Sequence, residues 1–137
     1  MLSYEDAASA IDWLCSAFGF TERTEARSTD TNGVVGHAEL RLGDGVIFVA
    51  TPNADYRGPK RHAEECEQAA RWRDNPWVID GVFAEVDDVD AHYARAVEHG
   101  ATILREPQEP GVGFRIYTAE DPEGHRWMFG SALADGH

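Results

Sequence analysis

The sequence predicts an α+β fold made of two pseudo-symmetric β-α-β-β-β modules. Three observations support this prediction: an amphipathic helical segment occurs twice, two strand-like segments follow each copy, and an acidic turn with glycine joins those strands in both halves. The modules cover about residues 1–52 and 78–131, and the polar residues 53–77 connect them. We therefore expect a single domain over residues 1–137.

One helix is predicted in each module, at residues 5–19 and 87–100. Apolar side chains recur there at helical spacing, so each helix has one buried face. Acidic residues stand at both expected N-termini, and Gly19 and Gly100 stand where a left-handed residue ends a helix. The start and stop signals therefore agree with the periodicity.

Alternating or continuous apolar runs between turn signals predict the strands. They are expected at residues 37–42, 46–50, 82–86, 115–118 and 126–129. In the first module the counterpart of strand 82–86 is reduced to residues 1–4, so we expect the first strand to be short or absent. The predicted core consists of Ile11, Leu14, Phe18, Leu40, Phe48, Val82, Tyr93, Ala96, Val97, Trp127 and Phe129.

Composition excludes several classes of partner. The chain has 25 Asp and Glu against 12 Lys and Arg, and its formal net charge is −13, which disfavours nucleic acids and anionic membranes. The longest apolar run, residues 46–50, is far shorter than the roughly 20 residues of a membrane helix. No secretion signal opens the sequence, and Cys15 and Cys66 lack zinc or disulfide spacing. We expect a soluble, cytoplasmic protein.

Four features of the sequence point to one family: the module order, the glycine after each helix, residues 36–44 and above all residues 120–130, EDPEGHRWMFG. In these features the chain resembles the glyoxalase, bleomycin-resistance and extradiol-dioxygenase superfamily, also called vicinal oxygen chelate. The resemblance covers nearly the whole chain. It implies a curled sheet around a cleft, with the helices outside, and a small organic molecule as partner. It also implies a homodimer, because the family commonly completes its clefts from two chains and a short first strand leaves a sheet edge to cover.

Metal-dependent members of this family take ligands from the first and last strands of each module. Four residues beyond the two turn glycines stand Val49 and Met128, and Gly81 stands at the start of the second module's first strand. The fourth position falls before the first residue. None of these residues is a donor for a divalent ion, so the sequence predicts no metal and no cofactor.

Three functions are compatible with these features. The favoured one is a metal-independent binding protein that sequesters an organic or cationic ligand, because an acidic chain without the metal donors matches the family's drug-binding members. The alternatives are a metal-dependent lyase or isomerase of the glyoxalase type with ligands elsewhere, and a non-catalytic remnant or regulatory domain. No Ser-His-Asp or Cys-His arrangement and no nucleotide fingerprint is visible, so no catalytic residue is identified.

The candidate ligand site follows from strand alternation. The polar residues of strand 37–42 share one face, which either lines the cleft or meets water. Trp127 and Phe129 make the better core pair, which sends their strand neighbours to the cleft. The tryptophans of the connection either line the mouth of the cleft or pin the connection to the core. The predicted ligand-binding residues are His37, Glu39, Arg41, Val49, Trp72, Trp77, Arg115, Tyr117, Arg126 and Met128.

Two further features of the sequence do not decide the function. The connection contains a possible short helix at residues 62–73 and is either a flap over a binding site or a solvated crossover. His92 and His99 stand seven residues apart on the second helix, and we expect both on a solvated helix face.

Overall fold

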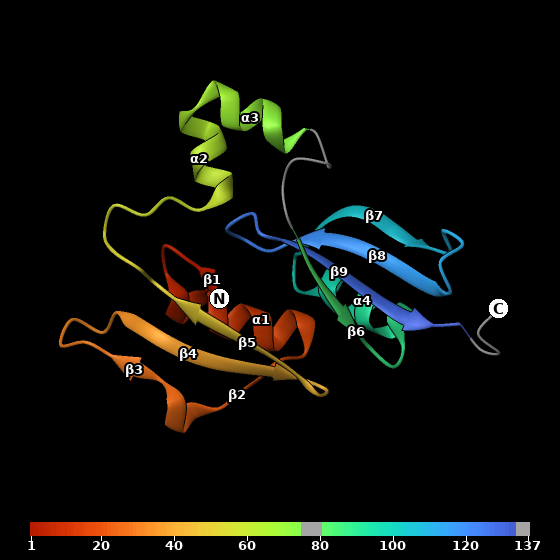
Figure 1. Ribbon diagram of the computed structural model, residues 1–137, viewed down its shortest axis with the longest axis horizontal. Coiled ribbons are helices and arrows are strands. Elements are labelled where there is room, and N and C mark those ends of the chain that lie inside the picture. Colours follow the sequence, from red (N-terminus) through yellow and green to blue (C-terminus); the bar gives the residue numbers. More distant parts are fainter. Residues whose placement is uncertain (75–80, 134–137) are drawn as a thin grey trace.

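The computed structural model describes residues 1–74 and 81–133, which form two sheets lying side by side (Figure 1). In the first sheet the strand order is β1-β5-β4-β2, and β3 also pairs with β4. The elements of this module are β1 (Leu2–Ser3), α1 (Ala7–Phe18), β2 (Thr21–Glu22), the 3-10 helix η1 (Thr24–Ala26), β3 (Ser28–Thr29), β4 (Val35–Leu42) and β5 (Gly45–Ala50).

The second sheet repeats this arrangement with the strand order β6-β9-β8-β7. In each module the first strand is parallel to the last one, whereas the central pair is antiparallel. The predicted fold of two β-α-β-β-β modules is therefore confirmed, and β1 is as short as expected. The second module consists of β6 (Gly81–Glu85), α4 (Val89–Glu98), β7 (Thr102–Gln108), β8 (Phe114–Glu120) and β9 (Arg126–Ala132).

Both long helices begin at an aspartate. The Asp6 carboxylate accepts the backbone N–H of Ser9 over 3.1 Å, and Asp88 accepts that of Ala91 over the same distance. Each carboxylate satisfies one of the N–H groups that the first turn leaves free. At the far end of α1, Gly19 has φ +80°, a left-handed conformation that favours glycine.

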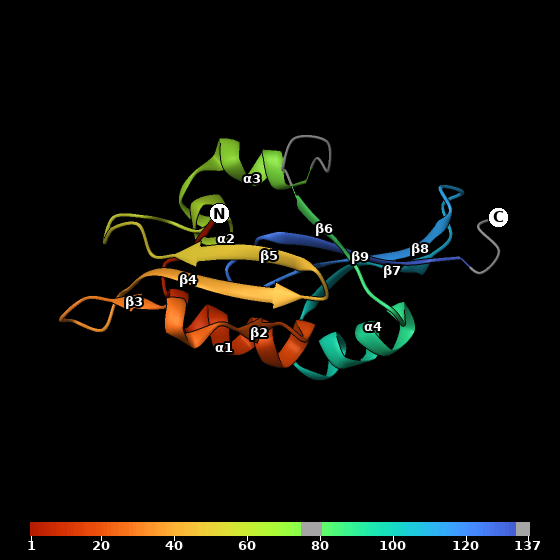
Figure 2. The same ribbon diagram turned by 60° about the horizontal axis from the view of Figure 1, so that its bottom comes forward.

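Helices α1 and α4 cover the same side of the two sheets (Figure 2). The core lies between these helices and the strands, and we call the opposite side of both sheets the open face. Fully buried side chains of this core include Tyr4, Ile11, Leu14, Phe18, Leu40, Val49, Tyr117, Trp127 and Phe129.

Two residues of the predicted core are exposed. Phe48 is 41% exposed because it points to the open face, while Val49 beside it takes the core position. Val97 is 48% exposed because the buried stripe of α4 passes through Val89 and Ala96. The prediction was therefore wrong at Phe48 and Val97.

The acidic turn between β8 and β9 is built around the buried Asp121. Its Oδ1 accepts the N–H groups of Glu123 and His125 over 3.1 and 3.0 Å, which closes the turn. Gly124 follows with φ +92°, and a Cβ there would lie 2.7 Å from the backbone nitrogen of Lys60. Only glycine suits this position, because a side chain would collide with the connecting segment.

The connection forms two short helices, α2 (Pro59–Glu65) and α3 (Glu67–Arg73), rather than one helix. We call residues 52–73 the arm. It lies on the side of the sheets opposite α1 and α4 (Figure 2). No helix in the described residues is long and apolar enough to cross a membrane.

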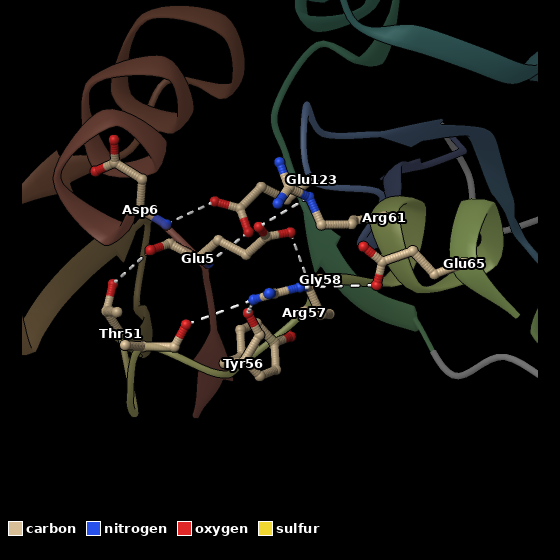
Figure 3. A network of polar contacts seen from close by, with 10 residues as sticks. Glu5, Asp6, Thr51, Tyr56, Arg57, Gly58, Arg61, Glu65 and Glu123 are labelled. Carbon is tan, nitrogen blue, oxygen red and sulfur yellow. Dashed lines mark hydrogen bonds and ion pairs between the residues drawn. The ribbon is translucent and has the colours of Figure 1, made fainter.

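The near end of the arm is fastened by two glutamates (Figure 3). The Glu123 carboxylate accepts the N–H groups of Glu5 and Asp6 over 2.6 and 3.0 Å. The Glu5 carboxylate accepts the N–H of Gly58 over 2.9 Å and lies 3.3 Å from Nε of Arg61. These contacts join the start of α1, the β8–β9 turn and the start of α2.

Candidate functional site

The open face of the first sheet combines polar and apolar side chains. Glu39 lies opposite Phe48 in the β4–β5 register, and Arg41 lies opposite Val46. The imidazole ring of His37 has its centroid 5.1 Å from that of Phe48. The polar row predicted on this strand is therefore on the open face, next to two exposed apolar side chains.

The open face of the second sheet is more apolar. Phe83 lies opposite Met128 in the β6–β9 register, and its ring meets Phe114 edge to face with centroids 5.7 Å apart. A Cβ on Gly130 would lie 3.2 Å from the Phe83 ring and 3.1 Å from Ile116. The glycine therefore leaves the space in which these side chains cover β9.

A buried carboxylate stands between two arginines at one end of this face. Glu120 is only 5% exposed and pairs with Arg126 over 3.4 Å and with Arg73 of the arm. The guanidinium of Arg126 also donates to the backbone carbonyl of Arg73. Two opposite charges compensate the burial of one carboxylate, and the same contacts attach the far end of the arm to the sheet.

The charges of the first sheet are arranged differently. Glu39 pairs with Arg23 over 3.2 Å, and Arg23 is itself shared with Glu25 over 2.9 Å. Hydrogen bonds to the two carboxylates raise the pKa of Arg23, and the bond to Glu25 has the larger effect. One arginine is thus shared by two carboxylates, so the charge of Arg23 neutralises Glu39 only in part.

Three predicted site residues lie on the helix side instead. Val49 and Tyr117 are fully buried in the core, and Arg115 extends to Asp90 of α4 over 3.0 Å. Placing these residues in the cleft was therefore wrong.

The error has a geometric cause. The β4–β5 turn consists of Gly43 and Asp44, whereas the β8–β9 turn spans residues 121–125. A count of four residues starts at Gly45, the first residue of β5, in one module and at Gly124, inside the turn, in the other. It therefore reaches opposite faces of the two last strands, because successive side chains of a strand alternate. Val49 faces the core, whereas Met128 faces outward.

The remaining predicted residues divide into two groups. The structure brings Arg126 and Met128 to the open face of the second sheet, and it brings His37, Glu39 and Arg41 to that of the first. Trp77 lies outside the described residues, as does the side chain of Trp72.

Sequence reasoning missed the aromatic part of the open face. Phe83 is 45% exposed there, next to Phe114 and Ile116. A signal was present in strand 81–85, GVFAE, where Phe83 alternates with the core-facing Val82 and Ala84. This alternation indicates a large aromatic ring on the face opposite the core.

His92 also departs from expectation. The sequence places it on a solvated helix face, but its ring is half-buried and makes two short contacts, to Phe18 and Tyr117. Burial lowers the pKa of His92, the nearby charge of Arg95 lowers it further, and the Phe18 carbonyl opposes both. His92 is therefore neutral at physiological pH.

The residues of the open face do not fit a divalent metal. Phe83, Met128 and Phe48 offer no suitable donor, and Glu120 is held by two arginines. Within residues 1–74 and 81–133, no three His, Cys, Asp or Glu side chains are grouped as metal ligands. A metal site needs at least three such donors, so no step through a metal is derived for this site.

Two β-α-β-β-β modules, each with a mixed sheet, and the helices α1 and α4 on the same side of both sheets define the vicinal oxygen chelate fold. The chain belongs to the Glyoxalase/Bleomycin resistance protein/Dioxygenase superfamily, whose sequence profile matches residues 1–129. An uncharacterized protein of Mycobacterium bovis, Mb0911c, is 31% identical over 134 residues, which are 98% of this chain and 82% of the relative.

Solved structures agree with this assignment. TioX from Micromonospora has a TM-score of 0.69 and 30% identity, and the match covers 97% of this chain and 93% of TioX. TnmS3, an antibiotic binding protein from Streptomyces, has a TM-score of 0.63 and 18% identity, covering 96% and 91%. The second likeness concerns the fold alone.

Proposed function

We propose that this protein binds a flat organic molecule on the open faces of its sheets, without a metal. The observation that carries the proposal is the uncovered pair Phe48 and Phe83, each on an open face and each more than two-fifths exposed. Aromatic rings supply most of the contact energy in small-molecule sites, and a few polar groups fix the orientation.

The charges around Phe48 favour a cationic ligand. Glu39 stands directly opposite Phe48, and the whole chain has a net charge of −13. A cation held beside an aromatic ring gains both from the carboxylate and from the ring face. On the second sheet, Arg126 lies beside the apolar surface of Met128 and Phe83 and orients an acceptor group.

We also propose that a homodimer completes the site. An exposed apolar surface of this kind on a monomer marks an interaction site, and two copies placed face to face would cover Phe48 and Phe83 together. The bound molecule would then lie between aromatic side chains of two chains. The antibiotic binding protein TnmS3 shares the fold, so a binding role is compatible with this architecture.

A thermal-shift screen tests this function. Planar aromatic cations and their neutral analogues are compared on wild type, with and without EDTA. Cations that raise the melting temperature are expected to lose most of that shift with Glu39→Ala and to keep it with EDTA. Glu25→Ala is the matched control, because Glu25 is the other carboxylate on Arg23 but belongs to η1.

Three outcomes contradict the proposal. A shift that disappears with EDTA indicates a metal-dependent site. Hits that are indifferent to Glu39→Ala, Arg126→Ala and Phe48→Ala place the site elsewhere. A panel without any stabilising compound removes the binding role assigned to the open faces.

A further inference from the structure

The two long helices cap each other's C-terminal ends. Arg95 of α4 donates from Nε to the Ser16 carbonyl over 2.7 Å and from a terminal nitrogen to Cys15 over 3.2 Å. In return, the indole N–H of Trp13 on α1 donates to the His99 carbonyl over 2.9 Å. Helix α1 has no basic residue in its last turn, so the second module supplies what its C-terminus lacks.

His92 completes this set of contacts. Its Nε2 lies 2.7 Å from the carbonyl oxygen of Phe18, the last residue of α1, and its Nδ1 lies 2.5 Å from the Tyr117 hydroxyl on β8. The ring also packs against Phe129 with centroids 4.2 Å apart. One imidazole therefore joins the end of α1 in the first module to the sheet of the second.

The two contacts define the protonation state of the ring. A carbonyl oxygen only accepts, so Nε2 carries the hydrogen and donates it to Phe18. Nδ1 is then the acceptor for the Tyr117 hydroxyl, and burial raises the pKa of Tyr117, so this hydroxyl keeps its proton. The neutral Nε2–H tautomer satisfies all three groups.

Protonation of Nδ1 would break this match. The imidazolium would donate on both sides, and the Tyr117 hydroxyl hydrogen would lose its acceptor. Among the described residues, His92 is the hydrogen-bond partner of that hydroxyl, and Tyr117 is fully buried. A buried donor without an acceptor is costly, so the protonated state disfavours the contact between the modules.

The His92 side chain is part of the wall of a groove. This groove of about 350 Å³ lies between the modules, and its wall also includes Phe18, Gly19 and Gly43. The charged groups that line it come from the end of β6, the β6–α4 link and α4, namely Glu85, Asp87, Asp88 and Arg95. Burial dominates and lowers the pKa of His92, the hydrogen bond to the Phe18 carbonyl opposes it, and the charge of Arg95 lowers the pKa further.

We propose that His92 is a pH-sensitive clamp between the two modules, closed when its ring is neutral and released when Nδ1 takes up a proton. Release frees the carbonyl end of α1 and loosens the relation between the two sheets. This proposal is independent of the ligand, because none of its residues lies on the open face.

Two measurements on the full chain test the clamp. In long-range ¹H–¹⁵N NMR spectra of wild type, His92 is expected as the Nε2–H tautomer and to titrate below the ordinary value of about 6.5. A titration at or above that value, or an Nδ1–H tautomer, would overturn the proposal. This readout requires no variant and so does not depend on the folding of one.

Urea denaturation gives the second readout. The unfolded chain takes up a proton on His92 near pH 6.5, before the folded chain does, so stability from the neutral ring is present above about pH 6.5 and is lost as the pH falls. The midpoint of wild type is expected to fall further between about pH 7.5 and pH 5 than that of His92→Gln, whose amide keeps a donor and an acceptor.

The matched control is His99→Gln at the C-cap of the same helix, since His99 is exposed and the hydrogen bond that its ring makes to the described residues is to the Arg95 carbonyl of α4. This variant should keep the wild-type pH dependence. Amide exchange of Gly19 and Phe20 should accelerate at low pH in wild type relative to His92→Gln. Equal pH dependence in wild type and His92→Gln would refute the clamp.

Discussion

The phenol of Tyr4 donates a 2.6 Å hydrogen bond to Oδ2 of Asp121, although the two residues are 117 positions apart. The indole N–H of Trp127 donates to the same oxygen over 3.1 Å. This carboxylate therefore joins the chain after β1 to the β8–β9 turn and to the largest side chain of the core. The motif that indicates the family is, in this protein, a structural link between the modules.

Removing the Asp121 carboxylate should destabilise the fold. Asp121→Ala leaves the buried donors of Tyr4 and Trp127 without an acceptor, and we expect a loss of about 3 kcal/mol in the free energy of unfolding. Tyr4→Phe removes one of these bonds and should cost about 1 kcal/mol. Urea denaturation measures both. Asp44→Ala, in the exposed β4–β5 turn, is the control, and an equal loss there would contradict the assigned role.

Trp127 and Phe48 should respond oppositely to truncation. Trp127→Ala removes a fully buried ring and should cost about 3–5 kcal/mol of unfolding free energy. Phe48→Ala removes a ring that is exposed within one chain and, measured where the protein is monomeric, should cost less than about 1 kcal/mol, while it weakens ligand binding. Chemical denaturation and the ligand titration separate the two effects. A large stability loss at Phe48 in the monomer would show that its ring is buried within the chain.

Glu120 should matter more for stability than Arg73. Glu120→Ala leaves Arg126 and Arg73 without their shared carboxylate and should cost about 3 kcal/mol, because it breaks a buried pair. In contrast, Arg73→Ala leaves Glu120 paired with Arg126 and should cost about 1 kcal/mol. Thermal and urea unfolding check the order. A larger loss for Arg73→Ala than for Glu120→Ala would contradict the role assigned to the buried Glu120 carboxylate.

The open faces should control the assembly state. Wild type should sediment at about 30 kDa at micromolar concentration, twice the chain mass of 15.1 kDa. Phe83→Glu and Phe48→Glu should give monomers, because a carboxylate would be buried between the chains. Val97→Glu is the matched control, since Val97 is as exposed as Phe83 but lies on α4. A wild-type mass near 15 kDa would exclude the dimer.

Local signals in the sequence were sufficient for the elements. The Asp6 cap, the glycine after α1 and the apolar stripe between them are all short-range, and the structure confirms the helix they predict. The same holds for α4 and for the pairing of β8 with β9, which share a short turn. Repetition of these signals was enough to predict two modules.

The facing of individual side chains was predictable only in part. Along β4 the alternation of Ala38 and Leu40 with His37 and Glu39 identified both faces. On β5 the unbroken apolar run VIFVA has no polar residue to mark its outer face, so Phe48 and Val49 were interchanged. When both faces of a strand are apolar, its sequence does not indicate which residues face the core.

By itself, the sequence determined the fold class, the family and the position of the two long helices, α1 and α4, because each depends on residues close together in the chain. Only the tertiary structure decided which residues meet across it. Tyr4 reaches Asp121, Arg73 reaches Glu120, and His92 joins Phe18 to Tyr117. These contacts depend on how two modules pack and on where the arm returns, and no local periodicity records that packing.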